Sequence, residues 1–523
     1  MKRIIIAMLV VCNCSLMMAQ TEVDVLKYVQ TDINGTARYM GMAGAFGALG
    51  GDASAIKDNP AGLGIYRKSE LVGSMNVLMQ NSTSNWKDMN GNDSYSYGDL
   101  YKTGFNNFSL VFASSTWQNE NKTSGLLNSN WSFGYNRLKN FNRSVSIKSG
   151  ASSSSLTHFM GDFTKSIPYE DLHYTSTYEP FDNTSVPWLS VLAFEGGLMK
   201  EFVTNDNKTD HWESLLNVGE TVIPSYYLTE KGYLDEYSIG WAGNFSNVFY
   251  FGATANLQAI NYTANSTYRE LFSGNGSFDL KNTINSKGNG INLNIGTIIR
   301  PTDFFRVGLS LHTPTVYVMK DQYFATVNYD AIEKGSISTP DDGYNDYQIQ
   351  GPMQVSLSAA LILGKKGVVS AEYNYSNYTG VRLMNKDGNP EDYTAENNGM
   401  KEMLNDVGML KIGGEYRLTD NFLLRAGYAN MNSINKVDAQ KYMVSNTIRT
   451  DTESFLHNGT NYITAGFGYR EASWFIDFAL MHKVQDEKFM SFNSNLLAPE
   501  YAVTPATVST VTNNIVVTLG LKF

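Results

Sequence analysis

The stretch Asn513-Asn514-Ile515-Val516-Val517-Thr518-Leu519-Gly520-Leu521-Lys522-Phe523 ends the chain with a strand pattern. Every second residue from Ile515 to Phe523 is apolar, and the residues between them, except Val516, are polar or small. In a soluble protein such an exposed apolar edge strand invites aggregation. In a membrane barrel the last strand pairs with the first and leaves no edge. The ending therefore favours a β-barrel in lipid.

Both ends of the sequence indicate export to the outer membrane. The ending on Phe523 resembles the C-terminal signal of outer-membrane proteins, so we expect the barrel-assembly machinery as a partner. At the other end, Lys2 and Arg3 precede the apolar run Ile4–Val11, which is too short to span a bilayer. We expect residues 1–19 to be a secretory signal peptide. The only cysteines, Cys12 and Cys14, would leave with it, so the mature chain would hold no disulfide and no cysteine metal site.

Composition excludes several classes of protein. The chain has 523 residues and a net charge of −10, and its acids and bases are dispersed. A nucleic-acid partner would require a basic stripe, so we expect none. The mean hydropathy is −0.27, and beyond the signal no run of about 18 apolar residues predicts a transmembrane helix. A barrel remains compatible, because only every second residue of its strands must be apolar.

Repeated hairpins fill the rest of the chain. Leu410–Arg417 alternates in period two and turns at Leu418–Asn421 into Phe422–Tyr428, and Ile463–Arg470 is followed closely by Trp474–Met481. Tight turns alternate with longer connections, expected near 260–290, 313–351, 382–407, 433–460 and 484–511. Strands expected near 70–80, 105–115 and 130–140 bring the total to about fourteen.

These observations predict an all-β fold. We expect a transmembrane antiparallel β-barrel of about 14 strands over residues 70–523, with tight periplasmic turns and long extracellular loops. The longest loop would be residues 141–234, which packs on itself and caps the barrel mouth, forms an apolar cleft that captures a ligand, or does both. A soluble β-sandwich or propeller also alternates, but it explains neither Phe523 nor the rhythm of short and long connections.

The segment between the signal and the first strand is rich in glycine. Glycine recurs at positions 41, 44, 47 and 50, and Asn59-Pro60 predicts a turn. A dinucleotide-binding loop is excluded, because no strand precedes these glycines and no βαβ unit follows.

This segment resembles the N-terminal hatch of the FadL/TodX family of outer-membrane transporters for long-chain fatty acids and other hydrophobic compounds. The matching stretches are Gly41–Ala45, Asp52–Ala55 and Asn59–Leu63, the last with the family's Asn-Pro-Ala. The resemblance implies a fourteen-stranded barrel and a periplasm-side hatch, or plug, within residues 20–69. The residues expected to shape the hatch are Gly41, Gly44, Asp52, Asn59, Pro60 and Ala61.

The resemblance also implies passive uptake of a hydrophobic compound. External loops would capture the molecule, an apolar pocket above the hatch would hold it, and a gap in the barrel wall near Trp131–Leu138 would release it sideways into the membrane. Candidate ligand contacts are Phe46, Leu49, Ile56, Leu63 and Ile65. The alternative is that these five side chains only pack the hatch against the wall.

Patterns for catalysis or metal binding are weak. The six histidines are scattered without an i, i+4 pair, and no nucleophile elbow or Walker loop is present. His312, Asp477 and His482 are the only catalytic candidates, and Asp477 and His482 would face opposite ways on one strand. We expect no enzyme activity, no metal and no cofactor. Lumen-facing charges such as Lys411, Glu415 and Arg425 are expected to form an interior network.

Two other functions remain open. A general porin for small polar solutes would explain the charged lumen face, and a surface binding or adhesion barrel would explain the large external fraction. In each case we expect a Gram-negative outer-membrane protein, monomeric as is usual for the family, in contact with outer-membrane lipid and lipopolysaccharide. The sequence does not distinguish fatty acids, aromatic hydrocarbons and other lipids as ligands.

Overall fold

The computed structural model describes residues 22–114, 124–202, 211–274, 276–330, 336–341, 343–444, 446–495 and 497–523. The expected signal peptide, residues 1–19, lies outside these ranges. Within them, no helix combines the length and the apolar character that a bilayer crossing requires.

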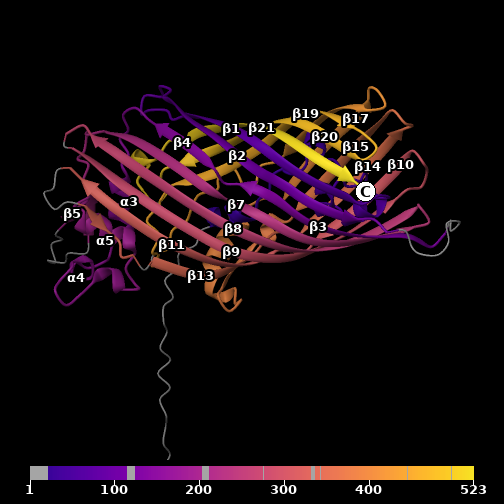
Figure 1. Cartoon of the computed structure of the whole chain (residues 1–523). Helices are drawn as coiled ribbons and strands as arrows, with labels where there is room; N and C mark the ends of the chain where they lie inside the picture. Colours follow the sequence, from indigo (N-terminus) through magenta and orange to yellow (C-terminus); the bar gives the residue numbers. More distant parts are fainter. Residues whose placement is uncertain are drawn as a thin grey trace, which may run out of the picture.

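One large antiparallel sheet forms the wall of the molecule (Figure 1). Its strands are β1 (Glu70–Asn85), β2 (Tyr95–Phe112), β3 (Leu126–Asn140), β4 (Arg143–Lys148), β7 (Val222–Phe245), β8 (Phe249–Phe272), β9 (Ser277–Ile299), β10 (Phe305–His312), β11 (Val316–Tyr329), β12 (Ile337–Ser338), β13 (Gly343–Gln350), β14 (Gln354–Leu363), β15 (Gly367–Ser376), β16 (Arg382–Asn385), β17 (Val407–Arg417), β18 (Phe422–Met431), β19 (Ser454–Arg470), β20 (Trp474–Met490) and β21 (Ala506–Lys522).

The sheet closes into a barrel of 14 strands, as the sequence predicts. Several of these strands are interrupted, so that β10 continues as β11, β13 as β14 and β15 as β16. Closure comes from the strand at the end of the chain. Residues 70–85 of β1 pair antiparallel with residues 507–522 of β21, and Leu71 lies opposite Leu521. The expected pairing of the last strand with the first is therefore confirmed.

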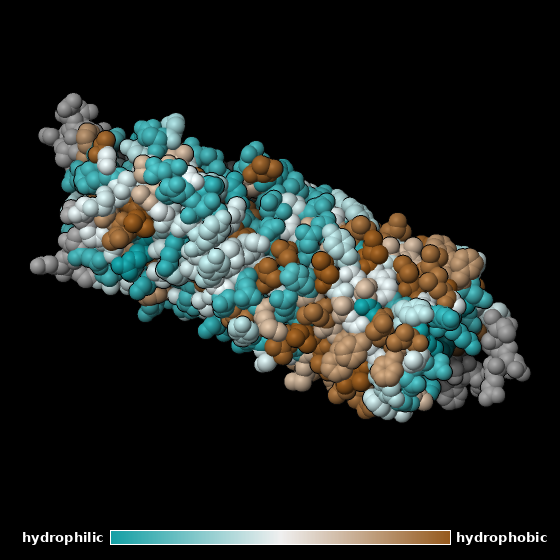
Figure 2. Space-filling model, turned by 90° about the horizontal axis from the view of Figure 1, so that it is seen from above, coloured by the Kyte–Doolittle hydropathy of each residue, from teal (hydrophilic) through white to brown (hydrophobic). Residues whose placement is uncertain are grey.

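Apolar side chains cover only part of the outer wall. Leu257, Ile291 and Leu519 are each about 60% exposed, at 61%, 61% and 59%. Figure 2 shows that hydrophobic residues gather on the half of the molecule that carries the C-terminus, whereas hydrophilic residues cover the other half. A barrel presents an apolar band about 25 Å tall to the bilayer. The hydrophilic half therefore extends beyond the membrane.

The expected long connection at 260–290 is wrong. β8 runs to Phe272 and β9 begins at Ser277, so only a short turn joins them. The outward side chains of this region, such as Asn285, Lys287 and Asn289, are polar because the strands continue past the bilayer. Without an apolar face, the strand pattern in the sequence is lost.

The connection between β4 and β7, residues 149–221, is shorter than the expected loop of 141–234 and contains helices and two short strands. It holds α3 (Leu156–Phe163), α4 (Tyr169–Leu172), η3 (Pro180–Asp182), α5 (Trp188–Glu195), β5 (Met199–Phe202) and β6 (His211–Ser214). Leu189 and Leu192 of α5 are fully buried. Figure 1 places α3, α4 and α5 at the end of the barrel opposite the C-terminus. We call this connection the cap.

The remaining helices are short. Between strands of the wall lie η4 (Tyr378–Gly380), η5 (Glu391–Tyr393), α6 (Thr394–Met403) and η6 (Pro499–Tyr501). Before the first strand lie α1 (Glu22–Val29), α2 (Ala37–Gly41), η1 (Ser54–Lys57) and η2 (Pro60–Ile65). Residues 36–66, which we call the plug, lie inside the barrel and are almost entirely buried.

Candidate functional site

The plug is held in shape by its own polar side chains. Thr36 caps α2, and its hydroxyl donates to both carboxylate oxygens of Asp52 at 2.9 Å. Asn59 caps η2 by accepting from the Ala61 amide at 3.1 Å, and Pro60 occupies the first turn, where no amide is needed. Gly44 has a φ of +72°, which a residue with a side chain adopts rarely. Of the predicted hatch residues, Gly44, Asp52, Asn59, Pro60 and Ala61 take part in these turns and contacts, and Gly41 lies at the end of α2.

Glycines of the wall form a seat for the plug. They are Gly252 on β8, Gly296 on β9, Gly308 on β10, Gly413 on β17 and Gly427 on β18. A Cβ atom on Gly296 would lie 2.0 Å from Oδ1 of Asn59, and one on Gly413 would lie 2.4 Å from the carbonyl oxygen of Met42. The backbone of the wall therefore meets the backbone of the plug, or the Asn59 side chain at Gly296, and only glycine permits the approach.

Polar side chains of the wall satisfy the backbone of the plug. Thr518 accepts from the Ala37 amide at 2.7 Å, and Glu372 accepts from the Gly47 amide at 2.7 Å. Asn294 donates to the Lys57 carbonyl at 2.9 Å, and Asn130 donates to the Leu63 carbonyl at 2.8 Å. These partners come from strands on opposite sides of the barrel, so the plug is anchored around its perimeter.

A buried ion network joins the plug to the wall. Arg38 of α2 donates to both carboxylate oxygens of Glu415 at 2.9 and 3.0 Å. Arg425 lies 2.7 Å from Glu415 and 2.7 Å from Asp477, and its side chain is fully buried. Burial alone would lower the pKa of Arg38, but the Glu415 carboxylate raises it above its ordinary value. The interior network expected from the lumen-facing charges is therefore present, and its side chains are largely buried.

The apolar residues predicted as ligand contacts lie within the packing of the plug. Phe46 is fully buried, with its ring centroid 5.8 Å from that of Tyr39. Leu49 belongs to the same apolar cluster. Ile56 and Leu63 share a second cluster, and Ile65 packs against a third. None of these five lines either hollow described below, and their contact with a ligand stays a prediction.

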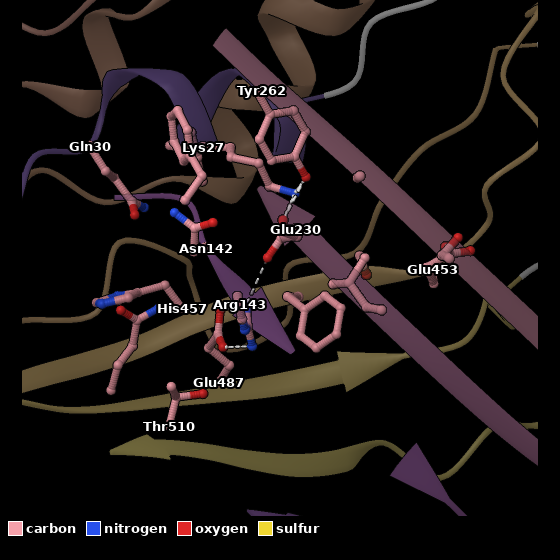
Figure 3. A pocket seen from close by; sticks show the side chains of 18 of the residues that line it. Lys27, Gln30, Asn142, Arg143, Glu230, Tyr262, Glu453, His457, Glu487 and Thr510 are labelled. Atoms are coloured by element: carbon pink, nitrogen blue, oxygen red, sulfur yellow. Dashed lines mark hydrogen bonds and ion pairs between the residues drawn. The ribbon is translucent and has the colours of Figure 1, made fainter. Parts of the chain in front are cut away.

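A cavity of about 160 Å³ lies in the lumen, beside α1 (Figure 3). We call it the lumen cavity. Aromatic rings form part of its wall, with Tyr226 and Phe455 both against Phe489 at centroid distances of 4.9 and 5.1 Å. Charged, neutral polar and a few aliphatic side chains form the rest. The lining is therefore mixed, in contrast to the apolar pocket that the family resemblance implies.

Ion pairs order the charged part of the lumen cavity, as the dashed lines of Figure 3 show. Lys27 of α1 lies 2.6 Å from Glu230, which also accepts from the Tyr262 hydroxyl at 2.5 Å. Arg143 pairs with Glu487 and lies 3.8 Å from Glu230. Asp32, three residues after the end of α1, pairs with Lys483 at 2.6 Å. Burial would raise the pKa of Asp32, but Lys483 and Lys139 hold it below its ordinary value.

Some polar atoms that line the lumen cavity lack a hydrogen-bond partner among the described residues. Buried atoms without a hydrogen-bond partner among the described residues include Oε2 of Glu453 and Nε of Arg143. Lys139 donates to the Lys27 carbonyl at 3.1 Å and to Oε1 of Gln30 at 3.3 Å, and no carboxylate of the described residues pairs with it. Its hydrogen-bond partners are neutral, and the carboxylates of Asp32 and Glu230 act on it only electrostatically, which leaves room for an added anion.

The barrel wall is thin between β2 and β3. β2 pairs with β1 along its whole length, but with β3 only over Asn107–Phe112. Beyond Arg137 the register of β3 with β7 shifts. There β4 pairs with β7 and lies against β1 and β2: Ser84 donates to the Ser146 carbonyl at 2.7 Å, and a Cβ atom on Gly98 would lie 2.7 Å from the Ser144 carbonyl oxygen. No ladder of the described residues therefore joins β2 to β3 above Asn107.

An apolar hollow lies on the outside of the barrel beside this break. It has a volume of about 990 Å³ and is lined by side chains of β2, β3, β7, β8, β9 and β11, including Phe108, Tyr135, Tyr237, Leu257 and Ile291. We call it the outer groove. Tyr135 stacks on Phe105 at 5.8 Å, so aromatic rings cross the break between the two strands.

The catalytic candidates have structural partners. His312 contacts the Asp58 carbonyl at 2.8 Å, Asp477 belongs to the ion network, and His482 contacts Oδ1 of Asn513 at 2.8 Å. The structure therefore does not bring Asp477 and His482 together. Across the described residues, no group of three histidine, cysteine or acidic side chains is arranged to hold a metal ion.

Comparison with known proteins places this architecture. The family model described as outer membrane protein transport protein (OMPP1/FadL/TodX) matches residues 234–512. A FadL homologue of Pseudomonas aeruginosa has a similar crystal structure, with a TM-score of 0.51, 12% identity and coverage of 94% of this chain and 99% of that one. The toluene transporter TodX of P. putida gives a TM-score of 0.49, 13% identity and coverage of 94% and 99%. No curated protein matches the chain.

Proposed function

Because the chain belongs to the OMPP1/FadL/TodX family of outer-membrane transport proteins, whose model matches more than half of it, we propose that it carries amphiphilic hydrophobic compounds inward across the outer membrane. The observation that carries the proposal is the lumen cavity of a plugged barrel, whose lining combines aromatic rings with the ammonium group of Lys139.

The lining of the lumen cavity favours a cargo with an acidic head and an apolar body. Solved relatives are described as transporters of toluene and channels for monoaromatic hydrocarbons, which are apolar molecules. A purely apolar molecule would leave the Lys139 ammonium group desolvated and without an added anion, which is costly. A carboxylate at Lys139, with its tail against Phe455 and Tyr226, satisfies both halves of the lining.

The thin wall between β2 and β3 supports a lateral exit. A molecule that leaves the lumen above Asn107 would reach the outer groove, whose lining is almost entirely apolar. The hydrocarbon core of the membrane does not oppose such a molecule, whereas the aqueous periplasm does. The cap supports capture from outside, because its helices cover the extracellular mouth of the barrel.

The acidic head gives a sharp test. In cells that take up labelled compounds through this protein, we expect Lys139→Met to reduce uptake of a long-chain carboxylate by about tenfold, since a hydrogen bond to a charged group contributes about 1.5–3 kcal/mol. Uptake of the primary alcohol of the same chain length should change little.

Lys165→Met is the matched control, because Lys165 is an exposed lysine of the cap. It should leave uptake of both compounds at the wild-type level. Equal loss of carboxylate and alcohol uptake in Lys139→Met would contradict recognition of the head group and would indicate a structural role for this lysine.

The general porin is the weaker alternative. A porin keeps a continuous water-filled channel. Here the plug binds wall strands on opposite sides of the lumen and is buried throughout, which supports a barrel that conducts few ions.

A further inference from the structure

The outer face of β7, β8, β9 and β11 is organised in rows that run across the strands. Tyr237, Leu257, Ile291 and Val316 form one such row, in which each residue lies directly opposite the next. This row crosses the outer groove, and Leu257 and Ile291 are each 61% exposed. The upper limit of the apolar band on this side of the barrel therefore lies near these residues.

Two lysines face each other just above the groove. Lys287 on β9 lies directly opposite Lys320 on β11, and both side chains are exposed. Each is four residues from the groove on its own strand, counted from Ile291 and from Val316, which corresponds to about 13 Å along the strand. The pair therefore stands at the height where the membrane passes from hydrocarbon to head groups.

Neither lysine forms an ion pair with a described residue, although Asp346 lies directly opposite Lys320. Asn261 lies beside Lys287 in the same row, and Asp346 lies beside Lys320. No ion pair joins Lys320 to Asp346, and the ammonium group of Lys320 instead lies 5.1 Å from the ring centroid of Tyr344. Like charges directly opposite each other destabilise a sheet. An external anion between the two ammonium groups would remove this repulsion.

We propose that Lys287 and Lys320 bind the phosphate of an outer-leaflet glycolipid, a lipopolysaccharide, whose acyl chain occupies the outer groove. The charge complementarity is direct, because two ammonium groups on adjacent strands match one phosphate with two or more acceptor oxygens. The apolar groove below them fits the acyl part of the same molecule. This site lies on the outside of the barrel, at the groove into which the proposed lateral exit opens.

Binding of purified lipid A to the full-length protein in detergent tests the proposal. We expect Lys287→Gln with Lys320→Gln to weaken binding of bisphosphorylated lipid A by about 10- to 30-fold, at about a factor of five per lysine. The matched control is Lys231→Gln with Lys281→Gln, because these exposed lysines face threonines across the strands and should leave binding unchanged. Lys287→Arg with Lys320→Arg should retain binding.

Two further measurements use the wild-type protein and are independent of how the variants fold. Dephosphorylated lipid A should bind as weakly as bisphosphorylated lipid A binds to the double glutamine variant. Inorganic phosphate should not displace the lipid, because it lacks the acyl chains. Equal affinity for the two forms of lipid A, full displacement by inorganic phosphate at equal concentration, or equal loss in the control pair would overturn the proposal.

Discussion

The double variant Gly413→Val with Gly427→Val opens the barrel to ions. We expect its single-channel current in planar bilayers to exceed that of the wild type by about an order of magnitude or more, because a barrel of this size without its plug holds a water-filled channel. A Cβ atom on Gly413 would lie 2.4 Å from the Met42 carbonyl oxygen, and one on Gly427 would lie 2.5 Å from the Met42 carbonyl carbon. The side chains of valine and the backbone of the plug cannot occupy the same space.

Gly414→Val is the matched control for this prediction. Gly414 is the neighbour of Gly413 on β17, but a Cβ atom there would meet only the Val368 carbonyl oxygen, at 3.5 Å. Valine is favoured in strands, so the barrel should assemble in all variants. A double variant that assembles and conducts no more than Gly414→Val would show that the plug does not depend on the glycine seat.

Glu415→Ala releases the plug through its charges. The substitution leaves Arg38 and Arg425 close together without the carboxylate that both now contact at 2.7 to 2.9 Å. Removing one partner of a buried ion pair costs about 3–5 kcal/mol. We expect amide hydrogen exchange over residues 36–66 to accelerate strongly in this variant, while exchange in β8 and β9 stays slow.

Arg417→Ala is the control, because Arg417 is on the same strand and exposed. Its exchange should equal that of the wild type. Glu415→Gln keeps the shape of the side chain without its charge, so its exchange should fall between those of the wild type and Glu415→Ala. Unchanged exchange in the plug of Glu415→Ala would contradict the role of the ion network as an anchor.

The barrel was predictable because the lipid-facing residues, every second residue of a membrane-spanning strand, must be apolar. Facing lipid, residues such as Leu519 and Leu521 must be apolar, and the lumen side is free to be polar, so period two appears in the sequence. Where the strands leave the membrane this constraint ends. The parts of β8 and β9 beyond the membrane have polar outer faces, which resemble a loop. The prediction of a connection at 260–290 is wrong for this reason.

The plug was predictable from its turns, but its contacts were not. Asn59 and Pro60 define a local turn, which a short stretch of sequence specifies. The seat formed by Gly296, Gly413 and Gly427 depends on which strands surround the plug and in what register. Glycines at inward-facing positions of predicted strands are a usable signal, because glycine weakens a strand unless another backbone approaches closely.

The mixed lining of the lumen cavity could not be predicted from the sequence either. Lys27, Arg143 and Glu230 are separated by many residues and meet only after the barrel closes and α1 enters the lumen. Sequence patterns report the outer, lipid-facing side of a strand more clearly than the inner side, because lumen positions are not restricted to one class of residue.

Uptake by whole cells tests the central claim most directly. Cells that differ only in this protein are given a labelled long-chain carboxylate and, separately, a small labelled sugar. A plugged barrel that carries amphiphilic compounds predicts faster accumulation of the carboxylate in cells with the protein and equal accumulation of the sugar. Faster entry of the sugar, with no difference for the carboxylate, would contradict the account and indicate an open polar pore.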